Sequence, residues 1–181
     1  VVVFGGGGVG LKIIQGAVLA GAGAIIAVDV NPHKMDIARA FGATHTILAG
    51  DDAEATRAQI RAITGGRGAD YAFEAVGLTT LQEQAMQATR PGGMAVLAGL
   101  APMGSATNSP GSILTREEKT VKGSYYGTVN PSRDFPLLLD LYMAGKLDLE
   151  SLISQEYTLS QINTAFDSML TGDVARGVIV F

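Results

Sequence analysis

The stretch VVVFGGGGVGL, residues 1–11, decides the fold. Val1–Phe4 is a continuous apolar run, which is typical of a strand buried on both faces of a parallel sheet. Gly5, Gly7 and Gly10 follow with the spacing G-x-G-x-x-G and open a helical stretch. In this pattern the first glycine permits a tight turn, the second lets the backbone approach a pyrophosphate, and the third lets the helix pack closely on the strand. The stretch therefore predicts a phosphate site at a helix N-terminus, where free N–H groups and the helix dipole favour an anion.

An acidic residue follows at the spacing that this motif requires. Asp29 ends the next apolar run, 19 residues after Gly10. A carboxylate at this position accepts hydrogen bonds from the adenosine ribose and repels the 2′-phosphate of NADP. We therefore predict an NAD site formed by Asp29 and by the loop residues Gly5, Gly7, Gly8, Val9 and Gly10. The alternative is structural: a flexible glycine turn, with Asp29 capping the turn before Pro32.

The order of the expected elements indicates the fold class. The first 100 residues alternate β-rich runs with helical stretches, which predicts a parallel sheet covered by helices. Ala101–Pro110 is expected to be a loop, and Thr158 with Gln161 forms a capping box for a last helix that ends at Gly172. We expect one α/β domain with a Rossmann-type, doubly wound parallel sheet of about six strands in three layers. Strands are expected at 1–4, 24–30, 46–48, 71–75, 94–98, 120–126 and 178–181.

The composition excludes several classes of protein. The chain has 181 residues, no cysteine, and 13 Lys and Arg against 17 Asp and Glu. No cluster of basic residues suits a nucleic acid. The longest apolar stretch, Gly16–Val28, falls short of the ~20 residues that a spanning helix needs. Without cysteine there is neither a disulfide nor a thiolate metal ligand. We expect a cytoplasmic protein whose partners are neither nucleic acid nor membrane.

Six segments together resemble a known family. VFGGGGVGL, AVDVNPHKMDIARAFGAT, DYAFEAVG, RPGGMAVLAGL, VKGSYYG and ARGVIVF occur along the chain in this order. They resemble the coenzyme-binding half of the medium-chain dehydrogenases/reductases, in particular the zinc-dependent alcohol dehydrogenases. The resemblance implies an NAD-binding domain over residues 1–181 and an N-terminal catalytic zinc domain that is missing from this chain. It also implies hydride transfer between a small alcohol or aldehyde and the nicotinamide, with zinc only in the absent domain. The isolated chain would then bind NAD without turnover.

The resemblance implies further coenzyme contacts. Lys34 matches a lysine that reaches the adenosine ribose, and Arg176 matches an arginine that clamps the pyrophosphate with its planar fork. A homodimer through the Thr120–Tyr126 strand is also implied, because an exposed sheet edge is open to pairing with a second copy. The remaining matched positions surround the nicotinamide end: Val76, Gly77, Ala98, Gly99, Leu100, Ser124 and Tyr126.

Two other functions stay open. A zinc-free quinone or enoyl reductase is one, although such enzymes usually prefer NADPH and Asp29 argues against it. A non-catalytic NAD-binding module is the other. Tyr142 and Lys146 form the Y-x-x-x-K pair of short-chain dehydrogenases, but residues 5–12 do not meet the glycine signature of that family. Tyr142 is therefore expected to pack in the core.

Neither catalytic residues nor metal ligands are expected in this chain. His33 and His45 are its two histidines, and neither has a partner at the spacing of a metal site. Both are expected to be structural or solvated. Lys119 follows Glu117 and Glu118, and this charged run is expected to form the solvated face of a helix.

Overall fold

The computed structural model describes residues 1–171 and 174–181, with the side chains of 170 and 171 left out. These residues form two compact units, Val1–Thr128 and Val129–Phe181. That the whole chain acts as one dinucleotide-binding domain stays a prediction.

The first unit contains a six-stranded parallel sheet. Its strand order is β3-β2-β1-β4-β5-β6, so consecutive strands proceed outward from β1 in one direction and from β4 in the other. This order confirms the predicted doubly wound sheet, and its switch point lies between β1 and β4. The strands are β1 (Val2–Phe4), β2 (Ile26–Asp29), β3 (His45–Leu48), β4 (Ala69–Glu74), β5 (Thr89–Leu97) and β6 (Thr120–Gly123).

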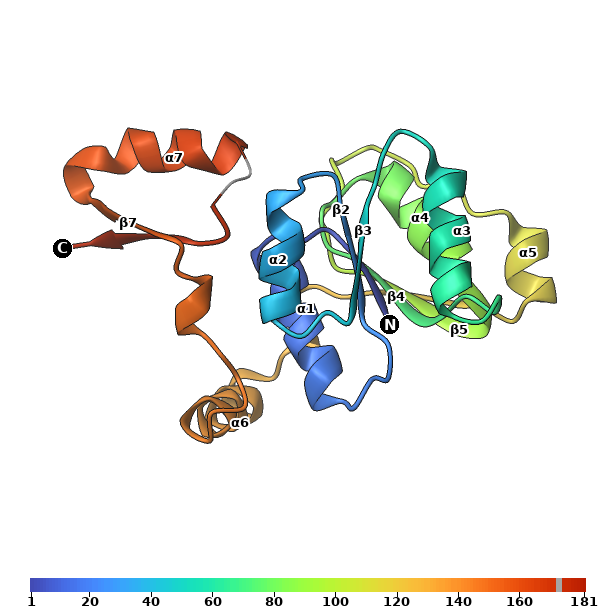
Figure 1. The fold of residues 1–181 in the computed structure, drawn as a ribbon, viewed down its shortest axis with the longest axis horizontal. Helices are drawn as coiled ribbons and strands as arrows, with labels where there is room; N and C mark the ends of the chain where they lie inside the picture. The colour runs from blue at the N-terminus through green and yellow to red at the C-terminus, as the bar shows by residue number, and fades with distance from the viewer. Residues whose placement is uncertain (172–173) are drawn as a thin grey trace. The chain divides into compact units, whose positions relative to one another are not determined.

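Helices cover both faces of this sheet. In Figure 1, α1 and α2 lie on one side of the strands, and α3 and α4 lie on the other, which gives the predicted three layers. The strand β1 has almost no exposure, as its unbroken apolar run predicts. The core between the layers includes Phe4, Ile26 and Ile60. The helices are α1 (Gly8–Leu19), α2 (His33–Ala40), α3 (Ala53–Ile63), α4 (Thr79–Ala88) and α5 (Gly111–Arg116).

Local sequence signals explain where these helices begin and end. The side chain of Asp52 accepts hydrogen bonds from two backbone N–H groups in the first turn of α3. Asn31 accepts the N–H of His33 at 2.9 Å and so caps the start of α2. Gly42, with φ +107°, follows the end of α2 in a conformation that a side chain would strain.

The second unit is smaller and contains a two-stranded parallel sheet. Its elements are α6 (Pro131–Met143), η2 (Glu150–Leu152), β7 (Gln155–Thr158), η3 (Leu159–Gln161), α7 (Ile162–Thr171) and β8 (Gly177–Val180). The predicted capping box is present, because the Gln161 side chain accepts the N–H of Thr158 at 2.9 Å. The predicted helix end at Gly172 lies outside the described residues.

The expected strand Thr120–Tyr126 is too long. β6 ends at Gly123, and Tyr126 begins a 3-10 turn, η1 (Tyr126–Thr128). The ladder stops because β5 itself ends at Leu97, whose carbonyl accepts the N–H of Ser124 at 2.9 Å as the last rung. Beyond this rung the aromatic residues have no neighbouring strand to pair with, and β-propensity alone does not extend a strand.

Two side-chain expectations were also wrong. Lys119 is not on a solvated helix face: α5 ends at Arg116, and the Lys119 side chain is 6% exposed. Its ammonium donates to the Met86 carbonyl and pairs with Glu117, which compensates its burial. Tyr142 is partly exposed instead of packed in a core, and its hydroxyl donates to Glu150 at 2.6 Å. This bond raises the pKa of Tyr142.

Within the part of the chain that the structure describes, no helix combines the length and the apolarity needed to cross a membrane.

Candidate functional site

The glycine turn after β1 is built by close backbone approach. Gly5 has φ +101°, and its N–H donates to the Val28 carbonyl of β2 at 2.8 Å. A Cβ at Gly10 would stand 1.8 Å from the Gly5 carbonyl oxygen. Both positions therefore require glycine, for the tight turn and for the close packing of helix on strand that the motif predicts.

The middle of the motif has a different environment. Nothing lies within 4 Å of the position that a Cβ on Gly7 would take. Gly7 is also the N-cap of α1, and no side chain caps it. The first turn of α1 thus begins at an open place with no competing side chain. Backbone N–H groups at such a helix start bind anions such as phosphate.

Asp29 ends β2 directly beside this turn. Its Oδ2 accepts the N–H of Gly6 at 2.7 Å, and its Oδ1 accepts the N–H of Asn31 at 2.9 Å. Lys34 places its ammonium 3.5 Å from Oδ2, and the Asp29 side chain is 8% exposed. Asp29 therefore caps the turn before Pro32, as the structural alternative expected. A carboxylate offers about four acceptor positions, so these three donors leave room for a ribose hydroxyl.

The turns after β4 and β5 meet backbone to backbone at the same edge of the sheet. Gly77 has φ +94°, and a Cβ there would lie 2.4 Å from the Leu100 carbonyl oxygen. A Cβ on Gly99 would lie 2.1 Å from the Gly77 nitrogen. The turn after β4 also reaches the glycine turn, because the Cβ position of Gly5 is 2.5 Å from a methyl group of Val76. The structure thus brings these sequence-predicted residues together at the switch point.

A cavity of about 450 Å³ adjoins these turns between the ends of β5 and β6. Its lining includes the predicted residues Ala98, Gly99, Leu100 and Ser124, with Leu97, Gly123, Tyr125 and Thr128. Tyr126 is 79% exposed and is not in this lining. The two tyrosine rings pack edge to face, with centroids 4.5 Å apart. Tyr125 and Thr128 are not among the residues predicted from the sequence, and the role of Tyr126 at the nicotinamide end stays a prediction.

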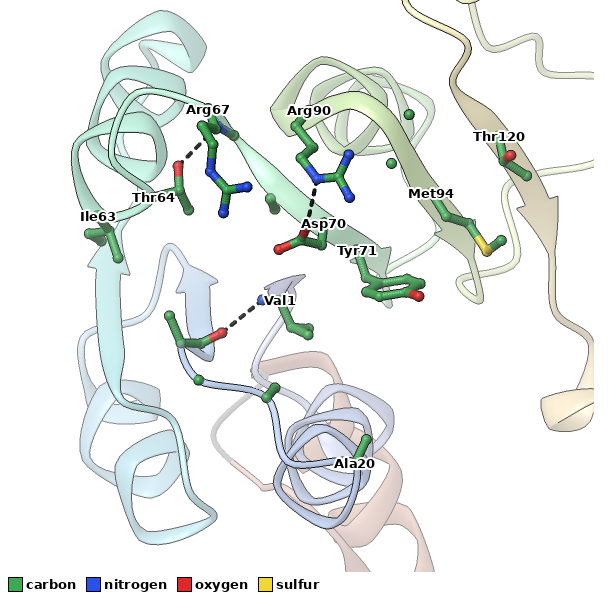
Figure 2. A pocket seen from close by; sticks show the side chains of 17 residues that line it. Val1, Ala20, Ile63, Thr64, Arg67, Asp70, Tyr71, Arg90, Met94 and Thr120 are labelled. Atoms are coloured by element: carbon green, nitrogen blue, oxygen red, sulfur yellow. Dashed lines mark hydrogen bonds and ion pairs between the residues drawn. The ribbon is translucent and has the colours of Figure 1, made fainter.

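A larger cavity, of about 650 Å³, lies at the opposite edge of the sheet. Figure 2 shows Arg67, Arg90 and Asp70 around it, with Val1 at the start of the chain. Arg90 donates to Asp70 at 2.5 Å, and this bond lowers the pKa of that carboxyl group. The cavity lies at the amino ends of β4 and β5, whereas open α/β sheets bind ligands outside the carboxyl ends of their strands. We therefore assign the candidate site to the other edge, despite its smaller cavity.

Arg176 belongs to the second unit. It lies just before β8 and is exposed, and its carbonyl accepts the N–H of Ser154 at 3.0 Å. Its role at the pyrophosphate stays a prediction.

The described residues do not gather three or more His, Cys, Asp or Glu side chains as a metal site would. His45 contacts the hydroxyl of Thr44 through Nδ1 at 2.8 Å, and His33 is exposed at the start of α2.

Comparisons with known proteins show what this chain is similar to. Residues 8–144 match the family model described as zinc-binding dehydrogenase. The NDMA-dependent alcohol dehydrogenase of Amycolatopsis methanolica is 38% identical, over 99% of this chain and 48% of its own length. The structure of benzyl alcohol dehydrogenase from Acinetobacter calcoaceticus is 30% identical with a TM-score of 0.90, over 98% of this chain and 48% of that one. A zinc-binding dehydrogenase from Sinorhizobium meliloti, bound to NADP, is 28% identical with a TM-score of 0.79, over 91% and 47%. The chain thus spans about half the length of these relatives.

Proposed function

The chain belongs to the zinc-binding dehydrogenase family, and from this premise we propose that its first unit binds NAD at the carboxyl edge of the sheet. One observation carries the proposal. The open helix start at Gly7 lies next to a nearly buried carboxylate, Asp29, which holds the Gly6 N–H. Hydrogen-bond donors for a phosphate and a hydrogen-bond acceptor for a ribose hydroxyl thus lie side by side, as a dinucleotide requires.

Each group has a separate task in this proposal. The backbone N–H groups at Gly7, Gly8 and Val9 bind the pyrophosphate. Asp29 accepts a ribose hydroxyl at its remaining acceptor position, and Lys34 orients the carboxylate. Bound NAD supplies a nicotinamide ring that accepts a hydride. The backbone of Val76, Gly77 and Ala98–Leu100, with Ser124, holds the nicotinamide end and keeps it beside the 450 Å³ cavity.

The preference for NAD over NADP rests on charge. Asp29 is 8% exposed, and one cation, Lys34, lies 3.5 Å from its Oδ2. A 2′-phosphate would bring about two negative charges to this carboxylate. Lys34 offsets only part of this repulsion, so the uncharged ribose hydroxyl of NAD is the better ligand. The Sinorhizobium relative is bound to NADP. The preference for NAD is therefore to be measured on this chain itself.

We propose that the whole protein is an alcohol or aldehyde oxidoreductase that transfers hydride between its substrate and the nicotinamide. Two relatives carry alcohol dehydrogenase in their names, and this chain spans about half of each. The described residues do not fit a zinc ion, because no suitable ligands converge among them. We propose that zinc and the substrate pocket belong to the part of the relatives' length that this chain does not span, and we expect the chain alone to bind NAD without turnover.

A homodimer is proposed through β6. This strand is one of the two edge strands of the six-stranded sheet, and all four of its residues are exposed. An unpaired edge favours antiparallel or parallel pairing with a second copy. Val121→Pro would remove one ladder donor from this edge. Sedimentation should then show a dimer for the unmodified chain and a monomer for V121P; a monomer in both contradicts the dimer.

Calorimetric titration of the chain with NAD and with NADP tests the coenzyme proposal. Gly7→Val is the informative variant, because Gly7 has extended backbone angles (φ −80°, ψ −173°) and open space around its Cβ position. The valine should leave the fold intact and block the approach of a phosphate. We expect saturable NAD binding that exceeds NADP binding and that is lost in G7V. Equal binding by G7V would contradict the assigned pyrophosphate position.

A further inference from the structure

A fully buried carboxyl group lies at the switch point of the sheet. Glu74 is the last residue of β4 and has 0% exposure. Its Oε2 is the one buried side-chain nitrogen or oxygen without a hydrogen-bond partner in the described part of the chain. Buried ionisable groups are costly and are retained where they have a task. Glu74 lies within the segment DYAFEAVG, whose residue pattern assigns it no role.

Glu74 joins two turns through four hydrogen bonds. Its Oε1 accepts the N–H of Val76 at 2.8 Å and the N–H of Gly77 at 2.7 Å. Its backbone carbonyl accepts the N–H groups of Ala98 and Gly99, both at 2.9 Å. One residue thus fixes the turn after β4 and the turn after β5, both of which the proposed function assigns to the nicotinamide end.

The free oxygen is directed at the second of these turns. Oε2 lies 2.5 Å from the position of a Cβ on Gly99. Gly99 belongs to the lining of the 450 Å³ cavity, whereas Asp29 and Lys34 form the adenosine end. The carboxyl group of Glu74 therefore contacts the nicotinamide end of the proposed site, whereas separate contacts of Asp29 and Lys34 form the adenosine end.

We propose that Glu74 is a positioning residue for the nicotinamide half of the coenzyme, an inference that rests on the proposed NAD site. Its Oε1 holds the Val76–Gly77 turn against Gly99. Its Oε2 limits how closely the Gly99 turn can approach the Val76–Gly77 turn. The backbone groups that would contact the nicotinamide thereby keep one arrangement before the coenzyme arrives. A site formed in advance does not lose binding energy in ordering its turns.

The substitution Glu74→Gln tests this role with little change in volume. The amide oxygen can keep the bonds to Val76 and Gly77, but an NH₂ group with two added hydrogens then takes the place of Oε2 beside Gly99. We expect these hydrogens to push the Gly99 turn outward and so displace the backbone groups that are assigned to the nicotinamide. The control is Glu83→Gln, because Glu83 also accepts a loop N–H, that of Asn108 at 2.8 Å, on the exposed side of α4. Both substitutions are the same chemically, and only the first is at the switch point.

Calorimetric titration with AMP and with NAD separates positioning from general support of the fold. AMP probes the adenosine end alone. We expect E74Q to lower NAD affinity at least tenfold and to change AMP affinity less than twofold, while E83Q changes neither. Equal losses of AMP and NAD binding in E74Q, or no loss of either, would overturn the proposal. Failure of the unmodified chain to bind NAD would instead overturn the proposed function.

A measurement on the unmodified chain keeps the proposal testable if E74Q does not fold. In ¹⁵N spectra, the amide signals of Val76, Gly77 and Gly99 should shift on addition of NAD and stay in place with AMP. Shifts of the same size with both ligands would overturn the assignment of these turns to the nicotinamide half.

Discussion

Replacing Asp29 by asparagine should shift the coenzyme preference of the chain from NAD toward NADP. A ribose hydroxyl that donates to a carboxylate contributes about 1.5–3 kcal/mol, against about 1 kcal/mol for a neutral acceptor. Asp29→Asn should therefore weaken NAD binding by about 0.5–2 kcal/mol, or roughly 2–30-fold. The folded chain should lose about 1–2 kcal/mol of stability as well, because one amide oxygen cannot accept both the Gly6 and the Asn31 N–H groups as the carboxylate does.

The same substitution should strengthen NADP binding. Two unit charges about 4 Å apart repel by about 4 kcal/mol at an effective dielectric constant of about 20. Lys34, 3.5 Å from the Asp29 carboxylate, offsets part of this repulsion. Removing the carboxylate and leaving Lys34 for the 2′-phosphate should then gain about 2 kcal/mol, or roughly 30-fold. Together the two effects change the ratio of NAD to NADP affinity by about 60- to 900-fold.

Calorimetric titration of both nucleotides into the unmodified chain and D29N measures this ratio. Asp36→Asn is the matched control, because Asp36 lies on α2 with a side chain that is 92% exposed. The control should leave the ratio unchanged within about twofold, since exposed charges are strongly screened. A shift below threefold in D29N, or an equal shift in D36N, would refute the assignment of Asp29 to the ribose.

Two further predictions concern stability. Gly7→Ala should change the free energy of unfolding by less than about 0.5 kcal/mol, whereas Gly10→Ala should lower it by about 2 kcal/mol or more, because its Cβ would stand 1.8 Å from the Gly5 carbonyl oxygen. Urea unfolding measures both, and equal losses would contradict the turn geometry. The hydrogen bond from Arg90 lowers the pKa of Asp70 below its ordinary value of 3.8, so this bond stabilises the fold above that pH and the gain is lost as the pH falls through the lowered pKa. Arg90→Gln should therefore destabilise the chain at neutral pH and lose that effect in acid; the same loss at both pH values would contradict the ion pair.

Much of the first unit could be predicted because its signals are local. The apolar run of β1, the capping of α3 by Asp52 and the positive-φ Gly42 after α2 each fix an element through nearby residues. The end of β6 could not be predicted, since it depends on where β5 stops. The helix expected at Glu117–Lys119 was misplaced: α5 ends at Arg116, and its six residues, GSILTR, are too few to show a helical period.

The site divides in the same way. The glycine turn and Asp29 could be found from spacing, because one short motif holds both. Glu74 could not, since its role depends on two turns that only the folded sheet brings together. Lys119 shows the opposite error: a charged run suggested solvent, but the Met86 carbonyl and Glu117 compensate the burial of its ammonium.

The central claim is that NAD binds at the carboxyl edge of the sheet, and amide chemical shifts of the ¹⁵N-labelled chain test it most directly. Titration with NAD should give saturable shifts at Gly7, Val9 and Asp29, while the residues around the larger cavity, Arg67 and Arg90 among them, stay unchanged. Saturable shifts confined to Arg67, Arg90 and their neighbours, or no saturable shift at all, would contradict the claim.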